Sequence, residues 1–409
     1  MKILALSQHY REENGGTAVY TRNICRAMAA EGHSVYLVTE QDEKTFAEVD
    51  EWEKADGYWI KRIAPGGCHF WERRSQMEIR AINAAVRREL DHWISSLNID
   101  VVHVLQGYRL AQTVLSRVPK GKLGFWTIHN VPPQEYTCKL MAKLPILNMA
   151  VKEIYFALTK VVNENILRNS PCVRLICNSN QTRKLALLAG VPPKRAVVVP
   201  VGIDSHLFAP ALAGVERTTK AEQGTPLILT VAGVIPHKGQ LDMIEAMKII
   251  VGELKDALYI NIGAIRDVAY YSQVLSRMKE LGLENRCCFL GHIPHSDMLR
   301  LYHACDVYVQ PSHQDGFNMS ALQALSCGKQ VVVTQAGAMP EYVQQIGAGR
   351  VVAPGLPEQL ANAVIDLANK GAAMDPQKQH MKVAAIYDWT VIAKETLRIY
   401  QADTATAAQ

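Results

Sequence analysis

The sequence lacks the features that would place it outside the ordinary globular proteins. It has no run of about 18 uninterrupted apolar residues, the length that a membrane-spanning helix requires. The best candidate, residues 146–162, is broken by Lys152, Glu153 and Lys160. The apolar start of the chain reaches only Leu6 before polar residues follow, which is too short for a secretory signal. Because 48% of the residues are hydrophobic and 20% are charged, a disordered chain is also excluded.

Paired cysteines are missing as well. The nine cysteines form no C-x-x-C pair, and neither they nor the 13 histidines have the spacing of a zinc site. An odd number of thiols cannot all pair within one chain. We therefore expect reduced cysteines in a cytoplasmic protein.

Positive charge is concentrated in one part of the chain. The formal net charge is +5, but residues 101–200 alone contain 14 Lys and Arg against three Asp and Glu. Residues 201–409 contain 17 basic and 20 acidic residues. This asymmetry indicates two domains with different partners. For the basic part a solvated surface, an anionic acceptor molecule and an anionic membrane surface all remain open. Nucleic acid is disfavoured, because no recognition motif of aromatic and basic residues accompanies the charge.

Two series of short apolar segments predict two parallel β-sheets. At 409 residues the chain is long enough for two or three domains. Apolar, β-branched segments that alternate with amphipathic helices are typical of parallel sheets covered on both faces. The first series comprises residues 2–7, 34–39, 101–104, 123–128, 174–177 and 197–200, and the second comprises residues 227–232, 258–262, 287–290, 307–309, 331–334 and 350–352. We therefore expect an α/β protein with two doubly wound, Rossmann-like domains facing a central cleft.

The boundary between the two domains is expected near residue 204. Residues 205–225 have no clear strand periodicity and indicate a connecting segment. The amphipathic residues 388–400 come after the second series is complete, so this helix is expected to cross back to the first domain. The first domain would then comprise residues 1–204 with a C-terminal helix at about 388–409, and the second would comprise residues 205–387.

The most specific chemistry lies in residues 310–328, with the sequence QPSHQDGFNMSALQALSCG. A predicted strand ends near Gln310, a loop carries Asp315 and Gly316, and a helix begins near Asn318. The free N–H groups and the positive dipole end of such a helix suit a phosphate group. Asp315 would lie beside them and accept hydrogen bonds from sugar hydroxyl groups.

This segment resembles the signature of retaining glycosyltransferase family 4, whose members have the GT-B fold. The family pattern is P-S-x-x-E-G-F-G-x-P-x-x-E-A. Asp315 and Gln323 occupy the two glutamate positions, and Asn318 and Ser320 replace the usual glycine and proline. The matching residues are Pro311, Ser312, Gly316, Phe317 and Ala324. The resemblance implies that Asp315 holds the donor sugar, that Gln323 binds the ribose, and that the donor is also bound at Gly316, Phe317, Asn318 and Met319.

Two of these positions also have a purely structural interpretation. Ser320 and Gln323 have the spacing of a capping box, in which the glutamine would satisfy a backbone N–H group. Asp315 precedes a glycine and can be an ordinary turn residue. Both alternatives stay open.

A second segment, residues 231–239 with the sequence VAGVIPHKG, resembles the family's G-R-x-x-x-x-K-G phosphate clamp. Lys238 and Gly239 match this pattern, whereas Gly233 stands at the arginine position. The resemblance implies that Lys238 neutralises the leaving diphosphate and that one of two expected cations is missing. Since a buried anion without its counter-charge is costly, either another base substitutes or activity is weak. A plain surface lysine is the alternative interpretation.

Weaker matches complete the resemblance, which extends from about residue 3 to residue 400. Gly16 lies in a segment that resembles the family's Gly-Gly loop, where the backbone can approach a sugar or phosphate closely. His129 lies in a T-x-H-D-like segment, with Asn130 replacing the aspartate, and would donate a hydrogen bond to the donor sugar or the acceptor. His292 lies in a segment that resembles the base-reading loop. An ordinary turn and a structural histidine are the alternatives at Gly16 and His129.

The resemblance implies a retaining glycosyltransferase. It would move a sugar from a nucleotide-sugar donor, most often a UDP-sugar, to an unidentified acceptor that is anionic or lipid-linked. In this mechanism a diphosphate oxygen helps to deprotonate the acceptor, so Asp315, Lys238 and His129 would orient and stabilise rather than attack. Many metal-dependent glycosyltransferases carry an Asp-x-Asp pair, which this chain lacks. We therefore expect no metal and no cofactor.

Three alternatives belong to other functional classes. The residues at positions 233 and 323 motivate a non-catalytic sugar-nucleotide binder, and an epimerase or a phosphorylase would share the fold. A dinucleotide-dependent dehydrogenase is disfavoured, because the first turn reads QHYREENGG rather than G-x-G-x-x-G.

One apolar segment, residues 144–162, allows two interpretations. It is either a pair of core-facing helices whose lysines reach outward, or a docking segment at a membrane surface or for a lipid acceptor. The second would place the protein peripherally at the inner face of a membrane. The bordering lysines are Lys139, Lys143, Lys152 and Lys160.

Overall fold

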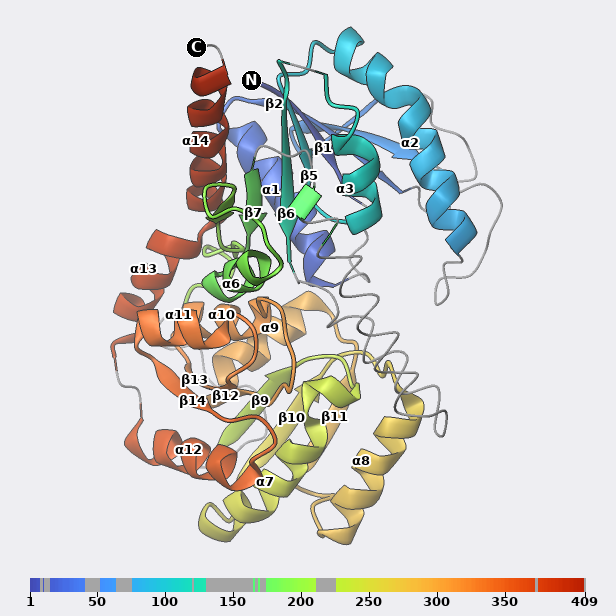
Figure 1. Cartoon of the computed structure of the whole chain (residues 1–409). Helices are drawn as coiled ribbons and strands as arrows, with labels where there is room; N and C mark the ends of the chain where they lie inside the picture. The colour runs from blue at the N-terminus through green and yellow to red at the C-terminus, as the bar shows by residue number, and fades with distance from the viewer. Residues whose placement is uncertain are drawn as a thin grey trace. The chain divides into compact units, whose positions relative to one another are not determined.

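The computed structural model describes residues 1–7, 10, 15–40, 52–63, 76–119, 121–129, 165, 168–169, 174–210, 226–371 and 374–407. The chain forms two compact units, each with a mainly parallel β-sheet and covering helices (Figure 1). Unit 1 comprises Met1–Gly202 and Trp389–Gln409, and unit 2 comprises Ile203–Asp388. The expected α/β architecture with two Rossmann-like domains is confirmed.

The sheet of unit 1 has the strand order β3-β4-β2-β1-β5-β6-β7-β8. Neighbouring strands are parallel except for β3 and β4, which are antiparallel. All residues of β5 and β6 are buried, as expected for apolar strands covered on both faces. The strands are β1 (Lys2–Leu6), β2 (Ser34–Glu40), β3 (Glu53–Ala55), β4 (Tyr58–Ile63), β5 (Val101–Val104), β6 (Leu123–Ile128), β7 (Arg174–Cys177) and β8 (Ala196–Val198).

The hairpin of β3 and β4 is absent from the sequence-based prediction. Its turn consists of Asp56 and Gly57, with φ angles of 50° and 87°. Two consecutive residues with positive φ form the type of hairpin turn that favours an Asp-Gly pair. This dipeptide between two short strands is the signal that would have predicted the hairpin.

The C-terminal helix belongs to unit 1, in agreement with the prediction that it returns to the first domain. It packs against α1, and its Asp403, which is 6% exposed, accepts a hydrogen bond of 2.8 Å from Arg174 Nη2 on β7. At the start of the helix, Trp389 leaves no room for a side chain on Gly202, whose added Cβ would stand 2.5 Å from the ring. The helices of unit 1 are α1 (Gly16–Ala30), α2 (Gln76–Ser96), α3 (Tyr108–Leu115), α6 (Asn180–Leu188) and α14 (Trp389–Ala407).

The sheet of unit 2 is parallel throughout and has the order β11-β10-β9-β12-β13-β14. Its strands are β9 (Leu227–Val231), β10 (Leu258–Ile262), β11 (Cys287–Gly291), β12 (Val307–Gln310), β13 (Gln330–Thr334) and β14 (Gly349–Val352). Its helices are η2 (Pro236–Lys238), α7 (Gln240–Glu253), α8 (Val268–Glu280), α9 (His295–Ala304), α10 (Met319–Ser326), α11 (Met339–Ile346), α12 (Pro357–Lys370) and α13 (Pro376–Tyr387). Strands are present at all six segments of the second predicted series.

Both sheets reverse their strand order beside their first strand. In unit 2 the neighbours of β9 are β10 and β12, and in unit 1 the neighbours of β1 are β2 and β5. At such a switch point the loops that follow the two adjacent strands turn to opposite faces of the sheet, and ligands bind at the carboxyl ends of the strands there. A ligand of unit 2 is therefore expected at the loops after β9 and β12.

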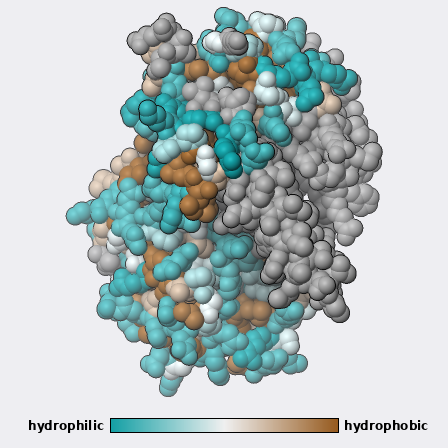
Figure 2. All heavy atoms as spheres, viewed as in Figure 1, coloured by the Kyte–Doolittle hydropathy of each residue, from teal (hydrophilic) through white to brown (hydrophobic). Residues whose placement is uncertain are grey.

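The described surface is mostly hydrophilic in the view of Figure 2, with hydrophobic areas that lie apart from one another. No helix within the described ranges is long and apolar enough to cross a bilayer. The segment 144–162 and its four lysines lie outside the described residues. The cysteines that the structure describes are free thiols, at positions Cys25, Cys177, Cys287, Cys288, Cys305 and Cys327.

Candidate functional site

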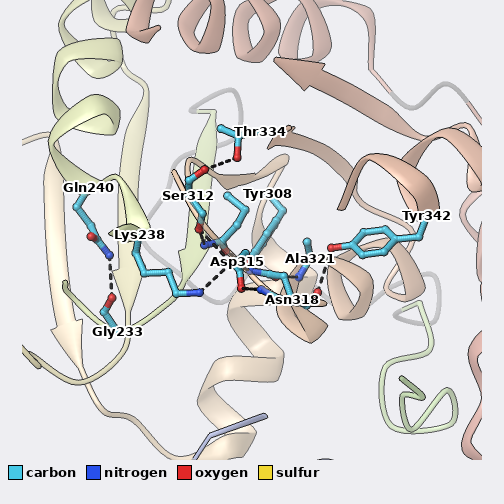
Figure 3. Close-up of polar contacts among 12 residues, drawn as sticks. Gly233, Lys238, Gln240, Tyr308, Ser312, Asp315, Asn318, Ala321, Thr334 and Tyr342 are labelled. Atoms are coloured by element: carbon cyan, nitrogen blue, oxygen red, sulfur yellow. Dashed lines mark hydrogen bonds and ion pairs between the residues drawn. The ribbon is translucent and has the colours of Figure 1, made fainter. Parts of the chain in front are cut away.

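Lys238 and Asp315 meet at the switch point of unit 2. Lys238 ends η2 after β9, Asp315 lies in the loop after β12, and the two strands are neighbours. Their side chains point toward each other in Figure 3, and Lys238 Nζ lies 2.8 Å from Asp315 Oδ2. The side chains are 20% and 9% exposed, respectively. The fold thus joins the two sequence segments that resemble the family motifs into one charged pair.

Asp315 is held by three further hydrogen bonds. Its Oδ2 accepts from the Ser312 hydroxyl at 3.1 Å and from Asn318 Nδ2 at 2.7 Å, and its Oδ1 accepts from the Gly316 N–H at 3.0 Å. Burial alone would raise the pKa of Asp315, but the Lys238 ammonium and the donated hydrogen bonds outweigh it and hold the pKa below its ordinary value. Asp315 is therefore an ionised carboxylate in a fixed orientation at neutral pH.

Asn318 has a left-handed backbone and caps α10. Its φ is 58°, a conformation that glycine adopts most readily and asparagine tolerates. This explains why asparagine can stand where the family usually has glycine. The Asn318 Oδ1 accepts from the Ala321 N–H at 2.9 Å, and the Tyr342 hydroxyl donates to the Asn318 carbonyl at 3.0 Å (Figure 3).

The capping-box interpretation of Ser320 and Gln323 is wrong, because the helix begins two residues earlier than that box requires. Asn318, not Ser320, is the N-cap residue. Gln323 instead lies half-buried on α10, where its Oε1 accepts from the Tyr302 hydroxyl at 3.2 Å. An amide group retains two N–H donors when its oxygen is engaged. The ribose role of Gln323 stays a prediction.

The N–H groups at the start of α10 fall into two sets. The Gly316 N–H is already bound to Asp315, and the Ala321 N–H to Asn318. Those of Met319 and Ser320 precede the first hydrogen bond within the helix and lie at its positive end. The side chain of Phe317 is a packing group, 7% exposed, with its ring 5.6 Å from that of Tyr342.

Gly239 allows the loops after β9 and β12 to approach each other. Its φ is 72°, and an added Cβ would overlap the carbonyl oxygen of Pro311. The His237 carbonyl also accepts hydrogen bonds from the N–H groups of His313 and Gln314, at 2.9 and 3.4 Å. Burial, and secondarily the Lys238 charge, lowers the pKa of His237 to about 4, so this histidine is neutral at pH 7.

His292 lies apart from this group in the described structure. It is exposed in the loop after β11, and β10 and β9 separate that strand from the switch point. It shares the carboxyl edge of the sheet with Lys238 and Asp315. Its predicted contact with the nucleotide base stays a prediction.

The two site residues that the sequence predicts in unit 1, Gly16 and His129, lie on the side of the sheet where the strands end. Gly16 is exposed and begins α1, with Gly15 as the N-cap at a φ of 77°. His129 follows β6, and its Nε2 donates to the Leu105 carbonyl at 3.1 Å. Burial lowers the pKa of His129 to about 4, so the ring is neutral and its Nδ1 is a hydrogen-bond acceptor. The expected donation from this ring to a ligand would require its protonated form.

A buried polar network near His129 was not expected from the sequence. His103 Nε2 and Thr127 Oγ1 are 2.8 Å apart, and His103 Nδ1 contacts the Tyr400 hydroxyl of α14. The Tyr20 hydroxyl lies 3.4 Å from Thr127 Oγ1, and the Tyr20 ring lies 4.6 Å from that of His129. His103 is completely buried, and burial lowers its pKa to about 3. A buried histidine in the middle of an apolar strand is the signal that could have revealed this network.

Two family profiles match successive parts of the chain. The profile described as Glycosyltransferase Family 4 matches residues 14–207, and that described as Glycosyl transferases group 1 matches residues 216–385. Among curated proteins, D-inositol 3-phosphate glycosyltransferase from Segniliparus rotundus is 24% identical over 357 residues, covering 84% of this chain and 75% of that protein.

Solved structures of similar fold cover nearly the full length of the chain. Sucrose-phosphate synthase from Thermosynechococcus elongatus aligns with a TM-score of 0.78 at 19% identity, over 99% of this chain and 100% of that one. HepE from Anabaena in complex with UDP and glucose aligns with a TM-score of 0.72 at 18% identity, over 98% and 100%. The two profiles together match most of the chain, and these structures share its fold. The chain therefore belongs to glycosyltransferase family 4, of the glycosyl transferases group 1 type with the GT-B fold.

Proposed function

We propose that this glycosyltransferase is a retaining enzyme that moves a sugar from a nucleotide-sugar donor to an anionic acceptor without a metal ion. The observation that carries the proposal is the Lys238–Asp315 pair at the switch point of unit 2. It combines a cation for a leaving diphosphate with an ionised acceptor for sugar hydroxyl groups. A UDP-sugar is the favoured donor, and the UDP and glucose bound to HepE support this choice.

The pair retains capacity for a ligand. The Oδ1 of Asp315 accepts one hydrogen bond, from Gly316, so a lone pair is available for a sugar hydroxyl. The Lys238 ammonium has three N–H groups and gives one to Asp315, which leaves two for phosphate oxygens. The N–H groups of Met319 and Ser320 would bind the diphosphate, and the amide of Gln323 would bind the ribose.

The proposed reaction needs no protein nucleophile. The bond between the sugar and the diphosphate breaks while the acceptor oxygen forms a bond on the same face of the sugar. The acceptor proton passes to an oxygen of the leaving diphosphate. Lys238 stabilises the negative charge that develops on this group, and Asp315 fixes the orientation of the sugar.

We assign acceptor binding to unit 1. Residues 101–200 carry 14 basic against three acidic residues, which favours an anionic acceptor. The name of the relative from Segniliparus rotundus includes a phosphorylated acceptor, D-inositol 3-phosphate, which supports the same chemistry. The neutral His129 would accept a hydrogen bond from an acceptor hydroxyl at Nδ1.

The test begins with a thermal-shift screen of UDP-, GDP- and ADP-sugars, because a ligand of the native state raises its stability. The donor found is then used to measure donor hydrolysis and transfer by the variants Asp315→Asn and Lys238→Met. Each variant should lose at least about a hundredfold in turnover, the effect of removing a group that stabilises the transition state. Matched controls are Asp366→Asn and Lys370→Met, an ion pair of the same residue types on the surface of α12, which should keep full activity.

The outcomes separate the alternatives. A wild-type protein that binds a sugar nucleotide but turns over no faster than both site variants would be a non-catalytic binder. If the nucleotide-sugar is converted to an isomer in the absence of any acceptor, the protein is an epimerase. Turnover should persist in EDTA, and a loss that magnesium restores would contradict the metal-free mechanism.

A further inference from the structure

The charge around Lys238 is insufficient for a diphosphate. A nucleoside diphosphate carries more than one negative charge, whereas the charge of Lys238 is already offset by Asp315 at 2.8 Å. His237, the preceding residue, adds no positive charge at pH 7, because burial keeps it neutral. Glycine at position 233 adds no side chain at all. If the proposed function holds, another cation has to reach this edge of the sheet.

Arg266 lies against Gly233. A Cβ added to Gly233 would stand 3.2 Å from both Cδ and Nε of Arg266, and 3.3 Å from the carbonyl oxygen of Ala264. The arginine side chain therefore occupies the space into which a side chain at position 233 would grow. Arg266 as a whole is exposed at the surface.

The backbone around Arg266 is fixed to the loop that carries Lys238. The Val234 N–H donates to the Ala264 carbonyl at 2.9 Å, and the Arg266 N–H donates back to the Val234 carbonyl at 3.1 Å. These bonds form a parallel bridge between Val234 and Ile265, just beyond the ends of β9 and β10. On the other side, the Gly233 carbonyl accepts from Gln240 Nε2 at 3.0 Å (Figure 3).

We propose that Arg266 is a donor-binding residue that supplies the positive charge absent at position 233. Its guanidinium group would contact the diphosphate of the nucleotide-sugar from the loop after β10, while Lys238 contacts it from the loop after β9. A guanidinium group suits this task, because it stays charged and its parallel N–H groups match phosphate oxygens. Gly233 and Arg266 then act together, because the glycine has no side chain and so leaves room for that of Arg266. This inference rests on the proposed function.

The first experiment measures nucleotide binding by titration calorimetry. UDP and GDP are the probes, with uridine and guanosine as the matching nucleosides that lack phosphate. Arg266→Ala should weaken diphosphate binding by about ten- to a hundredfold, as expected for a charge-assisted hydrogen bond, and leave nucleoside binding unchanged. The salt dependence of diphosphate binding should also become shallower. Arg286→Ala is the control, because Arg286 directly precedes β11 at the opposite end of the sheet and pairs with Asp256.

The second experiment moves the arginine. In the double variant Gly233→Arg with Arg266→Ala, two of the three close contacts at position 233 disappear, since they come from the Arg266 side chain. Gly233 has no positive φ, so an arginine is compatible with its backbone. Diphosphate affinity should return to within severalfold of the wild type, whereas Arg266→Ala alone remains weak.

Three results would overturn the inference while leaving the proposed function intact. They are wild-type diphosphate affinity in Arg266→Ala, an equal loss of diphosphate and nucleoside binding, and a double variant no tighter than Arg266→Ala. If the wild-type protein binds neither UDP nor GDP, and no sugar nucleotide in the thermal-shift screen, the proposed function itself is wrong.

Discussion

Units 1 and 2 each have a sheet whose strand order reverses beside its first strand. The two sheets carry different chemistry near their carboxyl edges. In unit 2 the described residues form an ionic pair, Lys238 and Asp315, held by loops on either side of the switch point. In unit 1 they form a neutral network around His103, in which Thr127 and Tyr400 are the ring's partners. In both units strand order determines where polar groups gather, whereas the side chains determine whether that place holds charge.

The two regions also differ in how they are held together. In unit 2 the backbones of two loops touch directly at Gly239 and Pro311, so the position of Lys238 depends on one glycine. In unit 1 the network includes Tyr400 of the C-terminal helix, which lies 297 residues after His103 in the chain and contacts its ring. Unit 2 should therefore be sensitive to an added methyl group, and unit 1 to an added proton.

The largest effect is expected for Gly239→Ala. The substitution requires a left-handed backbone for alanine and overlaps the Pro311 carbonyl, so the free energy of unfolding of unit 2 should fall by about 2–4 kcal/mol. The urea midpoint, followed by circular dichroism, measures this change. Gly252→Ala is the control, because Gly252 lies in α7 with no atom within 4 Å of an added Cβ, and alanine there should stabilise by up to about 1 kcal/mol. Equal midpoints for Gly239→Ala and the wild type would disprove the close approach of these loops.

A smaller effect is expected from pH on the network of unit 1. Unfolded histidine takes up a proton near pH 6.5, whereas burial lowers the pKa of folded His103 to about 3. The unfolded state then binds one more proton at this site, so His103 alone should lower the free energy of unfolding by about 1.4 kcal/mol per pH unit as the pH drops from 6 toward 4. The lowered pKa of Asp315 acts at a lower pH, where its contribution is lost as the pH falls below about 4.

The control for this pH effect is His103→Gln, which does not titrate. Urea unfolding of the two proteins at pH 7, 6 and 5 should show a shallower pH dependence for the variant. His129 and His237, whose pKa values are also lowered to about 4, should give both proteins a common residual slope. Parallel curves would mean that His103 is not buried in its neutral form.

The smallest effect is expected for Gln323→Glu, which adds a charge to the site of unit 2. The Tyr302 hydroxyl can donate to a carboxylate as well as to an amide oxygen, so stability should change by less than about 0.5 kcal/mol. Donor affinity should rise about two- to tenfold if a carboxylate binds ribose hydroxyls better. Gln345→Glu is a matched control, since Gln345 Oε1 also accepts from a tyrosine hydroxyl, that of Tyr387. An unchanged affinity in Gln323→Glu would argue against the ribose role.

Local patterns in the sequence were sufficient for most of the architecture. Strands such as β6 and β12 are short runs of buried apolar residues, and such runs are recognisable without knowledge of their partners. The hairpin of β3 and β4 was missed because β3 is short and both strands are partly exposed, although the Asp-Gly turn was readable. At the site, Asp315, Lys238 and the start of α10 follow from the motifs.

Other parts of the site depend on contacts that no local pattern contains. The capping residue of α10 is Asn318, whose left-handed backbone is stabilised by a hydrogen bond from the Tyr342 hydroxyl, 24 residues later in the chain. The tautomer of His129 is decided by the carbonyl of Leu105, 24 residues earlier. These features come from neighbours in space.

The amino-acid sequence by itself determined the two Rossmann-like sheets and the family, because hydrophobic periodicity and short motifs are local properties of the chain. Only the tertiary structure decided which charges meet. Lys238 and Asp315 are 77 residues apart and become a pair because β9 and β12 are neighbours, and Arg266 reaches Gly233 because β9 also pairs with β10. Distances between residues so far apart are set by strand order and packing, which a linear sequence does not display.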